Sequence, residues 1–126
     1  MDNPVGWFEI YVDDMERARA FYQKVLQVEL ERIDAEEAAT PGLDMWAFPM
    51  SQGQGAAGAL ARMAGMPAGG NSVIVYFNCA DCAAEAGRVV GAGGRVEREK
   101  FSIGRYGNIA IVQDTEGNVI GLHSMQ

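Results

Sequence analysis

Three side chains near the N-terminus alternate in a pattern that could form part of a binding site. Trp7, Glu9 and Tyr11 occupy every second position of the stretch GWFEIYV, so they share one face if this stretch is a β-strand. The intervening residues are purely apolar and can pack under a helix. A face that combines aromatic area with polar atoms is typical of a pocket wall. Glu9 would place a carboxylate in that wall.

His123 is the only histidine of the chain. Histidine is the side chain most easily set as an acid or a base near neutral pH. A carboxylate such as that of Glu9 beside it could orient the imidazole ring or abstract a proton from a bound substrate. The alternative interpretation is that Glu9 binds a backbone group or a tyrosine hydroxyl, and that His123 lies near an exposed C-terminus.

Cys79 and Cys82 form a C-x-x-C pair at the end of a predicted strand and the start of a predicted helix. This spacing occurs in redox dithiols, and a helix N-terminus lowers the pKa of a thiol. In the alternative interpretation Cys79 is a small core residue and Cys82 begins the apolar face of the helix. We favour the core interpretation, because a zinc site would need two further ligands and only His123 is on offer.

The elements that would position these residues occur twice. Residues 6–26 predict a strand, an acidic turn at Asp13 or Asp14 that caps a helix, and an amphipathic helix whose apolar side carries Met15, Ala18, Phe21 or Tyr22, and Val25. Residues 72–90 repeat the same order of events. Such a repeat predicts a duplicated architecture in which function lies where the two copies face each other.

Further strands complete each copy. In the first copy we expect a strand marked by Val28, Leu30 and Ile33, a loop or short helical turn over 34–42, a strand over 43–50, a turn over 51–57 and a strand over 58–63. In the second copy we expect a helix over 81–91 and strands over 72–78, 95–100, 107–113 and 119–124. The prediction is one domain over 1–126, with a first module at about 5–64, a linker at 64–71 and a second module at about 72–124.

Composition narrows the function. The chain has 126 residues, 48% hydrophobic and 21% charged, with a formal net charge of −7, which is typical of one globular domain. The negative charge and the lack of a Lys/Arg cluster argue against a nucleic-acid partner. No stretch of about 20 apolar residues predicts a membrane span, and the N-terminus lacks the pattern of a signal peptide. We therefore expect a cytoplasmic protein with no membrane partner.

The motif V-D-D-x-x-R-A-x-x-F-Y-x-x-V-L at 12–26 and the closing D-T-E-G-N-V-I-G-L-H at 114–123, together with the paired modules, resemble the vicinal oxygen chelate superfamily. That group contains glyoxalase I, bleomycin-resistance proteins and extradiol dioxygenases. The resemblance covers essentially the whole chain. It implies an α+β fold in which two βαβββ modules form a curved mixed sheet around a cup, commonly in a homodimer. It does not specify the reaction, because one fold hosts many activities.

Enzymes of this superfamily usually hold a divalent metal in the cup with His and Glu side chains. The resemblance places these ligand positions at Trp7, near Ile74, at 58–60 and at Gly121, and none of them carries a ligand here. Only Glu9 and His123 could rebuild a reduced site, and two donors alone would bind a metal weakly. We expect no metal and no other cofactor.

Alternation along the strands then predicts what lines the cup. If the strands pair as in the superfamily, Glu9 and His123 face the same cavity as candidate catalytic residues. The alternative for the aromatic residues is that they fill the core, and for Trp46 the two interpretations are balanced. The candidate ligand-binding residues are Trp7, Tyr11, Trp46, Tyr76, Asn78 and Tyr106.

Three functions follow. The first is a metal-independent binder of a small planar or cationic organic ligand, similar to drug-sequestering resistance proteins, with Glu9 offsetting the ligand's charge. The second is a metal-independent lyase or isomerase of glyoxalase type that uses Glu9 and His123 in acid–base chemistry. The third is a non-catalytic dimeric module whose cup is vestigial. We favour the binder.

Overall fold

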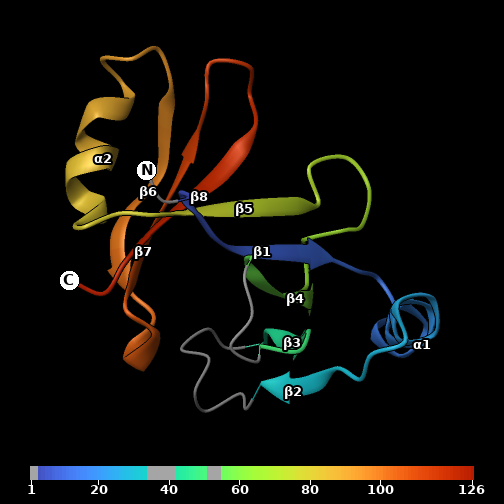
Figure 1. Cartoon of the computed structure of the whole chain (residues 1–126). Helices are drawn as coiled ribbons and strands as arrows, with labels where there is room; N and C mark the ends of the chain where they lie inside the picture. The colour runs from blue at the N-terminus through green and yellow to red at the C-terminus, as the bar shows by residue number, and fades with distance from the viewer. Residues whose placement is uncertain (1–2, 34–41, 51–54) are drawn as a thin grey trace. The chain divides into compact units, whose positions relative to one another are not determined.

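The computed structural model describes residues 3–33, 42–50 and 55–126. The chain forms two compact units: an N-terminal unit, Trp7–Val73, and a C-terminal unit, Met1–Gly6 with Ile74–Gln126 (Figure 1). The loop predicted over 34–42 and the turn predicted over 51–57 fall mainly outside the described residues. No helix in the described part of the chain is long and apolar enough to cross a membrane.

The N-terminal unit contains one helix and a four-stranded mixed sheet. Its strands lie in the order β2-β3-β4-β1, with β1 and β4 parallel and the other neighbours antiparallel. The elements in chain order are β1 (Val5–Tyr11), α1 (Met15–Leu26), β2 (Glu31–Ile33), β3 (Asp44–Ala47) and β4 (Ala57–Arg62).

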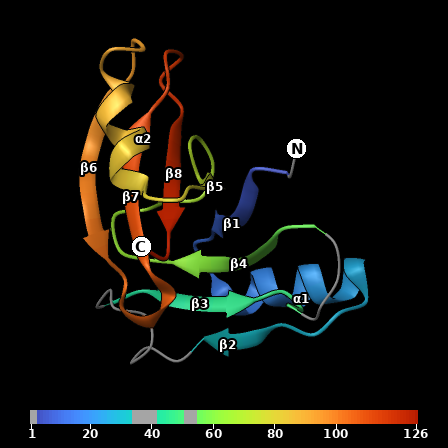
Figure 2. The same cartoon turned by 60° about the vertical axis from the view of Figure 1, so that its left-hand side comes forward.

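The C-terminal unit repeats this plan. Its strands lie in the order β5-β8-β7-β6, with β5 and β8 parallel and the other neighbours antiparallel. Figure 2 shows α2 lying along the strands of this sheet. The elements in chain order are β5 (Val73–Asn78), α2 (Cys82–Val89), β6 (Arg95–Ser102), the 3-10 turn η1 (Gly104–Tyr106), β7 (Asn108–Gln113) and β8 (Val119–Ser124).

The predicted α+β class and the two βαβββ modules are therefore confirmed. The second strand is shorter than predicted and begins at Glu31 rather than near Val28. The reason is the end of α1, where Gln27 adopts a left-handed conformation with φ of 56°. Here the backbone N–H groups of Val28 and Leu30 donate to Gln23, to its carbonyl and its side-chain oxygen respectively. These bonds hold residues 28–30 to the helix.

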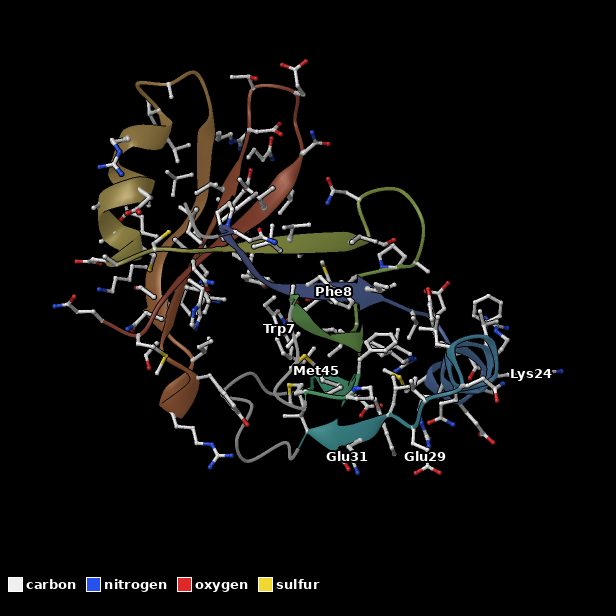
Figure 3. All side chains as sticks on the ribbon, viewed as in Figure 1. Trp7, Phe8, Lys24, Glu29, Glu31 and Met45 are labelled. Carbon is white, nitrogen blue, oxygen red and sulfur yellow. The ribbon has the colours of Figure 1, made fainter. Side chains whose placement is uncertain are left out.

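Helix α1 begins where the sequence predicts. Asp14 is the N-cap residue, and its side chain accepts a hydrogen bond from the backbone N–H of Arg17 at 3.0 Å, which satisfies one of the free N–H groups at the helix start. Lys24 projects from the helix away from the sheet (Figure 3).

The helix packs on the sheet through a small cluster of buried side chains, Val12, Met15, Leu30 and Leu60, with Ala18 and Tyr22 packed against it. The prediction that Val25 lies on the apolar side of the helix is wrong, and the structure decides between Phe21 and Tyr22. Val25 is 60% exposed, and Phe21 is 58% exposed, so Tyr22 is the aromatic residue that faces the core.

Helix α2 covers a second cluster, formed by Cys82, Ala86, Ala110, Val112 and Leu122. The backbone N–H of Cys82 donates to the hydroxyl of Ser124, and Asp81 caps the helix by accepting from the N–H of Ala83. The last strand is therefore tied to the first turn of the helix.

In each unit an aromatic ring lies over a glycine of the neighbouring parallel strand. Phe8 is paired with Gly58, and Tyr76 with Gly121. A Cβ atom added at Gly121 would come 2.1 Å from the Tyr76 ring, and one at Gly58 would come 2.4 Å from the Phe8 ring. Any side chain at either position would displace the ring, so glycine is required for these contacts.

We predict that Gly121→Ala lowers the free energy of unfolding by roughly 1–3 kcal/mol, the usual cost of overpacking. Urea unfolding followed by circular dichroism measures it. The control is Gly87→Ala in the middle of α2, where an added Cβ meets nothing within 4 Å and should stabilise the helix by up to about 1 kcal/mol. In a Tyr76→Ala background Gly121→Ala should cost much less; equal costs in both backgrounds would contradict the contact.

Candidate functional site

The carboxylate of Glu9 is held by its two neighbours on the same face of β1. The indole N–H of Trp7 donates to Oε2 at 3.2 Å, and the hydroxyl of Tyr11 donates to Oε1 at 2.9 Å. Glu9 is only 8% exposed. The period of two along the strand brings these three residues together, as the sequence predicts, and the interpretation in which Glu9 binds a tyrosine hydroxyl is also confirmed.

The phenol of Tyr11 acts as a hydrogen-bond donor in this arrangement. Its pKa is raised well above the usual range, first by burial and then by the negative charge of Glu9 and the hydrogen bond to it. Tyr11 therefore stays protonated at neutral pH and cannot serve as a base there.

Small side chains lie beside Glu9 on the same face of the sheet. Register pairs Glu9 with Ala59, and Ala59 with Ala47. Ala57 and Ala61, two residues to either side of Ala59, pair with Trp7 and Tyr11. Ala59 and Ala61 are fully buried, and Ala47 is 3% exposed. The alternating stretch A-G-A-L-A at 57–61 is the sequence signal for these small side chains, and our sequence analysis missed it.

We call this surface of the N-terminal unit the Glu9 face. Figure 3 labels two of its members, Trp7 and Met45. Its residues are Trp7, Glu9, Tyr11, Met45, Ala47, Ala57, Ala59 and Ala61.

Trp46 lies on the other side of the same sheet. It pairs with Leu60, which pairs with Ile10, and it packs against the core cluster under α1 together with Phe48. The guanidinium of Arg19 lies over its ring, with 3.5 Å between Cζ and the ring centroid. Trp46 therefore belongs to the helix-covered face and does not accompany Trp7 and Tyr11.

In the C-terminal unit, the predicted residues Tyr76, Asn78 and His123 share the face opposite to α2. Tyr76 pairs with Gly121 and Asn78 with His123, whereas the intervening Phe77 and Leu122 pack in the cluster under α2. The backbone N–H of Asn78 donates to the carbonyl of Pro4 at 2.8 Å. The alternation predicted for these two strands is thus present.

His123 is joined to the turn before β7. Its Nε2 lies 2.6 Å from the carbonyl oxygen of Tyr106. Because a carbonyl only accepts, Nε2 carries the proton, and Nδ1 is the acceptor in the neutral ring. Gly107 makes this approach possible, since its φ is 105° and an added Cβ would lie 3.2 Å from Nε2. Tyr106 thus contributes its backbone here, while its ring is 37% exposed.

Glu9 lies in the N-terminal unit and His123 in the C-terminal unit. Their action on one ligand in a common cup stays a prediction.

The donor set does not fit the divalent metal that the resemblance implies. The Trp7 indole N–H is a donor only, and the Tyr76 ring covers Gly121. Among the described residues, no group of three or more His, Cys, Asp and Glu side chains could hold a metal ion.

The two cysteines lie in the core under α2, as predicted. Cys82 is fully buried, and Cys79 packs against the same cluster. Burial, followed by the hydrogen bond and charge of Glu85, raises the pKa of Cys79 to about 11. A thiol with so high a pKa carries almost no thiolate at neutral pH, which is the opposite of a redox-active cysteine.

We predict that neither thiol reacts quickly with a thiol reagent in the folded protein at pH 7. The alkylation rate of Cys79 should still rise with pH above 9, since its thiolate forms near pH 11. Mass spectrometry after timed exposure to iodoacetamide measures both rates, with urea-unfolded protein as the control. Rapid native labelling of both cysteines would reverse this assignment.

We predict that Tyr11, one of the four tyrosines, fails to ionise in the folded protein near pH 10. The substitution Tyr11→Phe should therefore leave the number of tyrosines that ionise near this pH unchanged. Absorbance at 295 nm during an alkaline titration measures it. Because the folded-state pKa is raised, the contribution of Tyr11 to stability is complete below about pH 10, its pKa in the unfolded chain, and is lost as pH rises further. Ionisation of all four tyrosines at pH 10 without unfolding would contradict the Glu9 contact.

Comparisons with known proteins agree with the fold. The family model of the Glyoxalase/Bleomycin resistance protein/Dioxygenase superfamily matches residues 5–122. No curated protein sequence shows significant similarity to the chain.

Several solved structures share the fold at low sequence identity. A methylmalonyl-CoA epimerase variant from Streptomyces coelicolor, in complex with 2-nitronate-propionyl-CoA, has a TM-score of 0.68 at 19% identity, covering 97% of this chain and 96% of that one. The methylmalonyl-CoA epimerase from Mycobacterium tuberculosis has a TM-score of 0.66 at 15% identity, covering 98% and 88%. A hypothetical protein from Bacillus halodurans has a TM-score of 0.72 at 12% identity, covering 100% and 96%.

These identities show the shared fold and leave the reaction open. The family match spans nearly the whole chain, and the two βαβββ modules are those expected of the family. The chain belongs to the Glyoxalase/Bleomycin resistance protein/Dioxygenase superfamily.

Proposed function

We propose that this chain binds a small organic ligand on the Glu9 face, without a metal, and that the ligand carries a positive charge or a strong hydrogen-bond donor next to a planar group. The observation that carries the proposal is the buried carboxylate of Glu9, hydrogen-bonded between the rings of Trp7 and Tyr11. The ligand-binding roles expected of Tyr76, Asn78 and Tyr106, which lie in the C-terminal unit, stay predictions.

Charge and ring chemistry together support a cationic ligand. The negative charge of Glu9 already raises the pKa of Tyr11, and the same charge would attract a cation. Aromatic faces attract a cation within about 6 Å of the ring centroid by roughly 0.5–2 kcal/mol. A cation placed here gains both interactions, whereas an anion would be repelled by Glu9. The net charge of −7 acts in the same direction.

Native mass spectrometry of freshly purified, untagged protein is the first test. It reports the oligomer, any metal and any retained small molecule in one spectrum. We expect a dimer without metal, with an organic adduct that dissociates on collisional activation. One zinc, manganese, iron or nickel ion per chain after washing with a chelator would overturn the metal-free site, and a bare dimer would favour a vestigial cup.

We predict that Glu9→Gln weakens the binding of a planar cation by about tenfold, which corresponds to about 1.4 kcal/mol. An N-methylquinolinium salt is a suitable probe, with quinoline-2-carboxylate as its anionic counterpart. Quenching of Trp7 fluorescence in a Trp46→Phe background measures the affinity. The matched control is Glu99→Gln, which removes the same charge from an exposed position on β6. Equal affinity of the two variants, or stronger binding of the anion, would argue against the proposal.

A second candidate function is a metal-independent isomerase in which Glu9 exchanges a proton with the substrate, assisted by His123. The fold shared with methylmalonyl-CoA epimerases makes an acyl-CoA with an acidic α-proton the first substrate to test. Exchange of that proton in D2O, surviving chelation and abolished in Glu9→Gln, would favour this enzyme over the binder. If the proton exchange is unchanged in the His123→Gln variant, His123 takes no part in this reaction.

A further inference from the structure

A second polar constellation lies on the helix-covered side of the N-terminal sheet, around Trp46. Arg19 on α1 stacks over the Trp46 ring on β3, with 3.5 Å between Cζ and the ring centroid. Trp46 is half-buried at the edge of the core cluster. At this distance the guanidinium makes a cation–π contact with the indole.

Two polar atoms near this pair lack the partners that buried groups normally have. Within the described part of the chain, the buried side-chain nitrogen and oxygen atoms without a hydrogen-bond partner are Arg19 Nε and Asp44 Oδ1. Leaving such an atom without a hydrogen bond is unfavourable, because its interaction with water has been lost and not replaced. An unpaired group of this kind in a folded protein commonly marks the place of a bound water, ion or ligand.

Both atoms belong to the surroundings of Trp46. Asp44 precedes Trp46 by two residues on β3, so it points to the same face about 7 Å along the strand. Arg32 on β2 is paired with Trp46, and its Nε lies 3.6 Å from Asp44 Oδ1. That ion pair is largely exposed, so it compensates Asp44 only weakly. The three charged groups sum to one positive charge.

We propose that this constellation, Arg19, Trp46, Asp44 and Arg32, binds a small carboxylate that also carries a hydrogen-bond donor, as a hydroxy acid or an amino acid does. The edge formed by Nε and one Nη of Arg19 matches the two oxygens of a carboxylate. Asp44 Oδ1 accepts from the hydroxyl or ammonium group of the same ligand. A hydroxy-acid monoanion would bring the net charge of the cluster to zero, an amino-acid zwitterion would leave it unchanged, and with either ligand both unpaired atoms would gain partners.

This site is distinct from the Glu9 face. Trp46 and Leu60 occupy the side of the sheet under α1, whereas Glu9 and Ala59 occupy the other side. The inference therefore stands independently of the proposed function. It also gives Trp46 a ligand-binding role on the opposite face from the one the sequence predicted.

Trp46 fluorescence in a Trp7→Phe background tests the site, because Trp46 is then the sole tryptophan. The ligands are sodium glycolate, glycine and sodium acetate, titrated at constant ionic strength against sodium chloride. We expect a saturable change with glycolate and glycine, at least threefold weaker affinity for acetate, and no saturation with chloride. Equal saturation by chloride would overturn the proposal, because it would indicate an adventitious ion only.

Three substitutions and one control variant test whether the fluorescence change comes from ligand bound at this site. Arg19→Gln should weaken glycolate binding at least tenfold, and Arg19→Lys nearly as much, because it keeps the charge but loses the planar fork. Arg17→Gln, an exposed position on the same helix, is the matched control and should leave the affinity unchanged. Asp44→Asn should abolish the preference for glycolate over acetate.

A glycolate response that survives in both Arg19 variants would overturn the proposal. Thermal melting checks that each variant is folded. If Arg19→Gln is unfolded, Arg19→Lys alone tests the role of Arg19 in glycolate binding. A crystal structure from 50–100 mM glycolate, on the order of the weak affinities expected of so small a ligand, gives an independent readout. Water alone at Arg19 Nε and Asp44 Oδ1 in that crystal would also refute the site.

Discussion

The parallel pairing of the first and last strand in each module is the constraint on which the rest of the structure depends. It matches β1 with β4 and β5 with β8 in a register that places Phe8 beside Gly58 and Tyr76 beside Gly121. Because side chains alternate along a strand, this register decides for every residue of the sheet whether it faces the helix or the opposite side. A slip by one residue would place Glu9 under α1 and its apolar neighbours on the opposite face.

Each sheet therefore has two chemically different faces. The helix-covered faces carry the two apolar core clusters, including the C-x-x-C cysteines, and the N-terminal one also carries Asp44 and Arg32 near Trp46. The opposite faces carry the side chains with hydrogen-bonding groups, Glu9 with Trp7 and Tyr11 in one module and Tyr76, Asn78 and His123 in the other. The proposed ligand site follows from this separation, because a buried carboxylate is stable only where donors meet it.

Two of the positions at which the superfamily holds its metal are occupied here by residues with other contacts. At Gly121 the space above the backbone holds the ring of Tyr76, so the carboxylate that the resemblance places there could not fit without moving that ring. At the opposite module, Trp7 uses its N–H for Glu9. At these two positions the chain therefore has an indole and a glycine, neither of which is a metal ligand.

The sequence by itself determined the order of elements, the helix caps and which residues of one strand share a face, because capping and alternation depend on residues only a few positions apart. It also predicted the Glu9 cluster, whose members are two residues apart. The tertiary structure decided the length of β2, the exposure of Phe21 and Val25, and the position of Trp46 under α1. These features depend on the pairing of β3 with β4 and on the contact of Gln23 with Leu30. Pairing between distant segments sets which face a residue occupies, and local sequence patterns carry no information about that register.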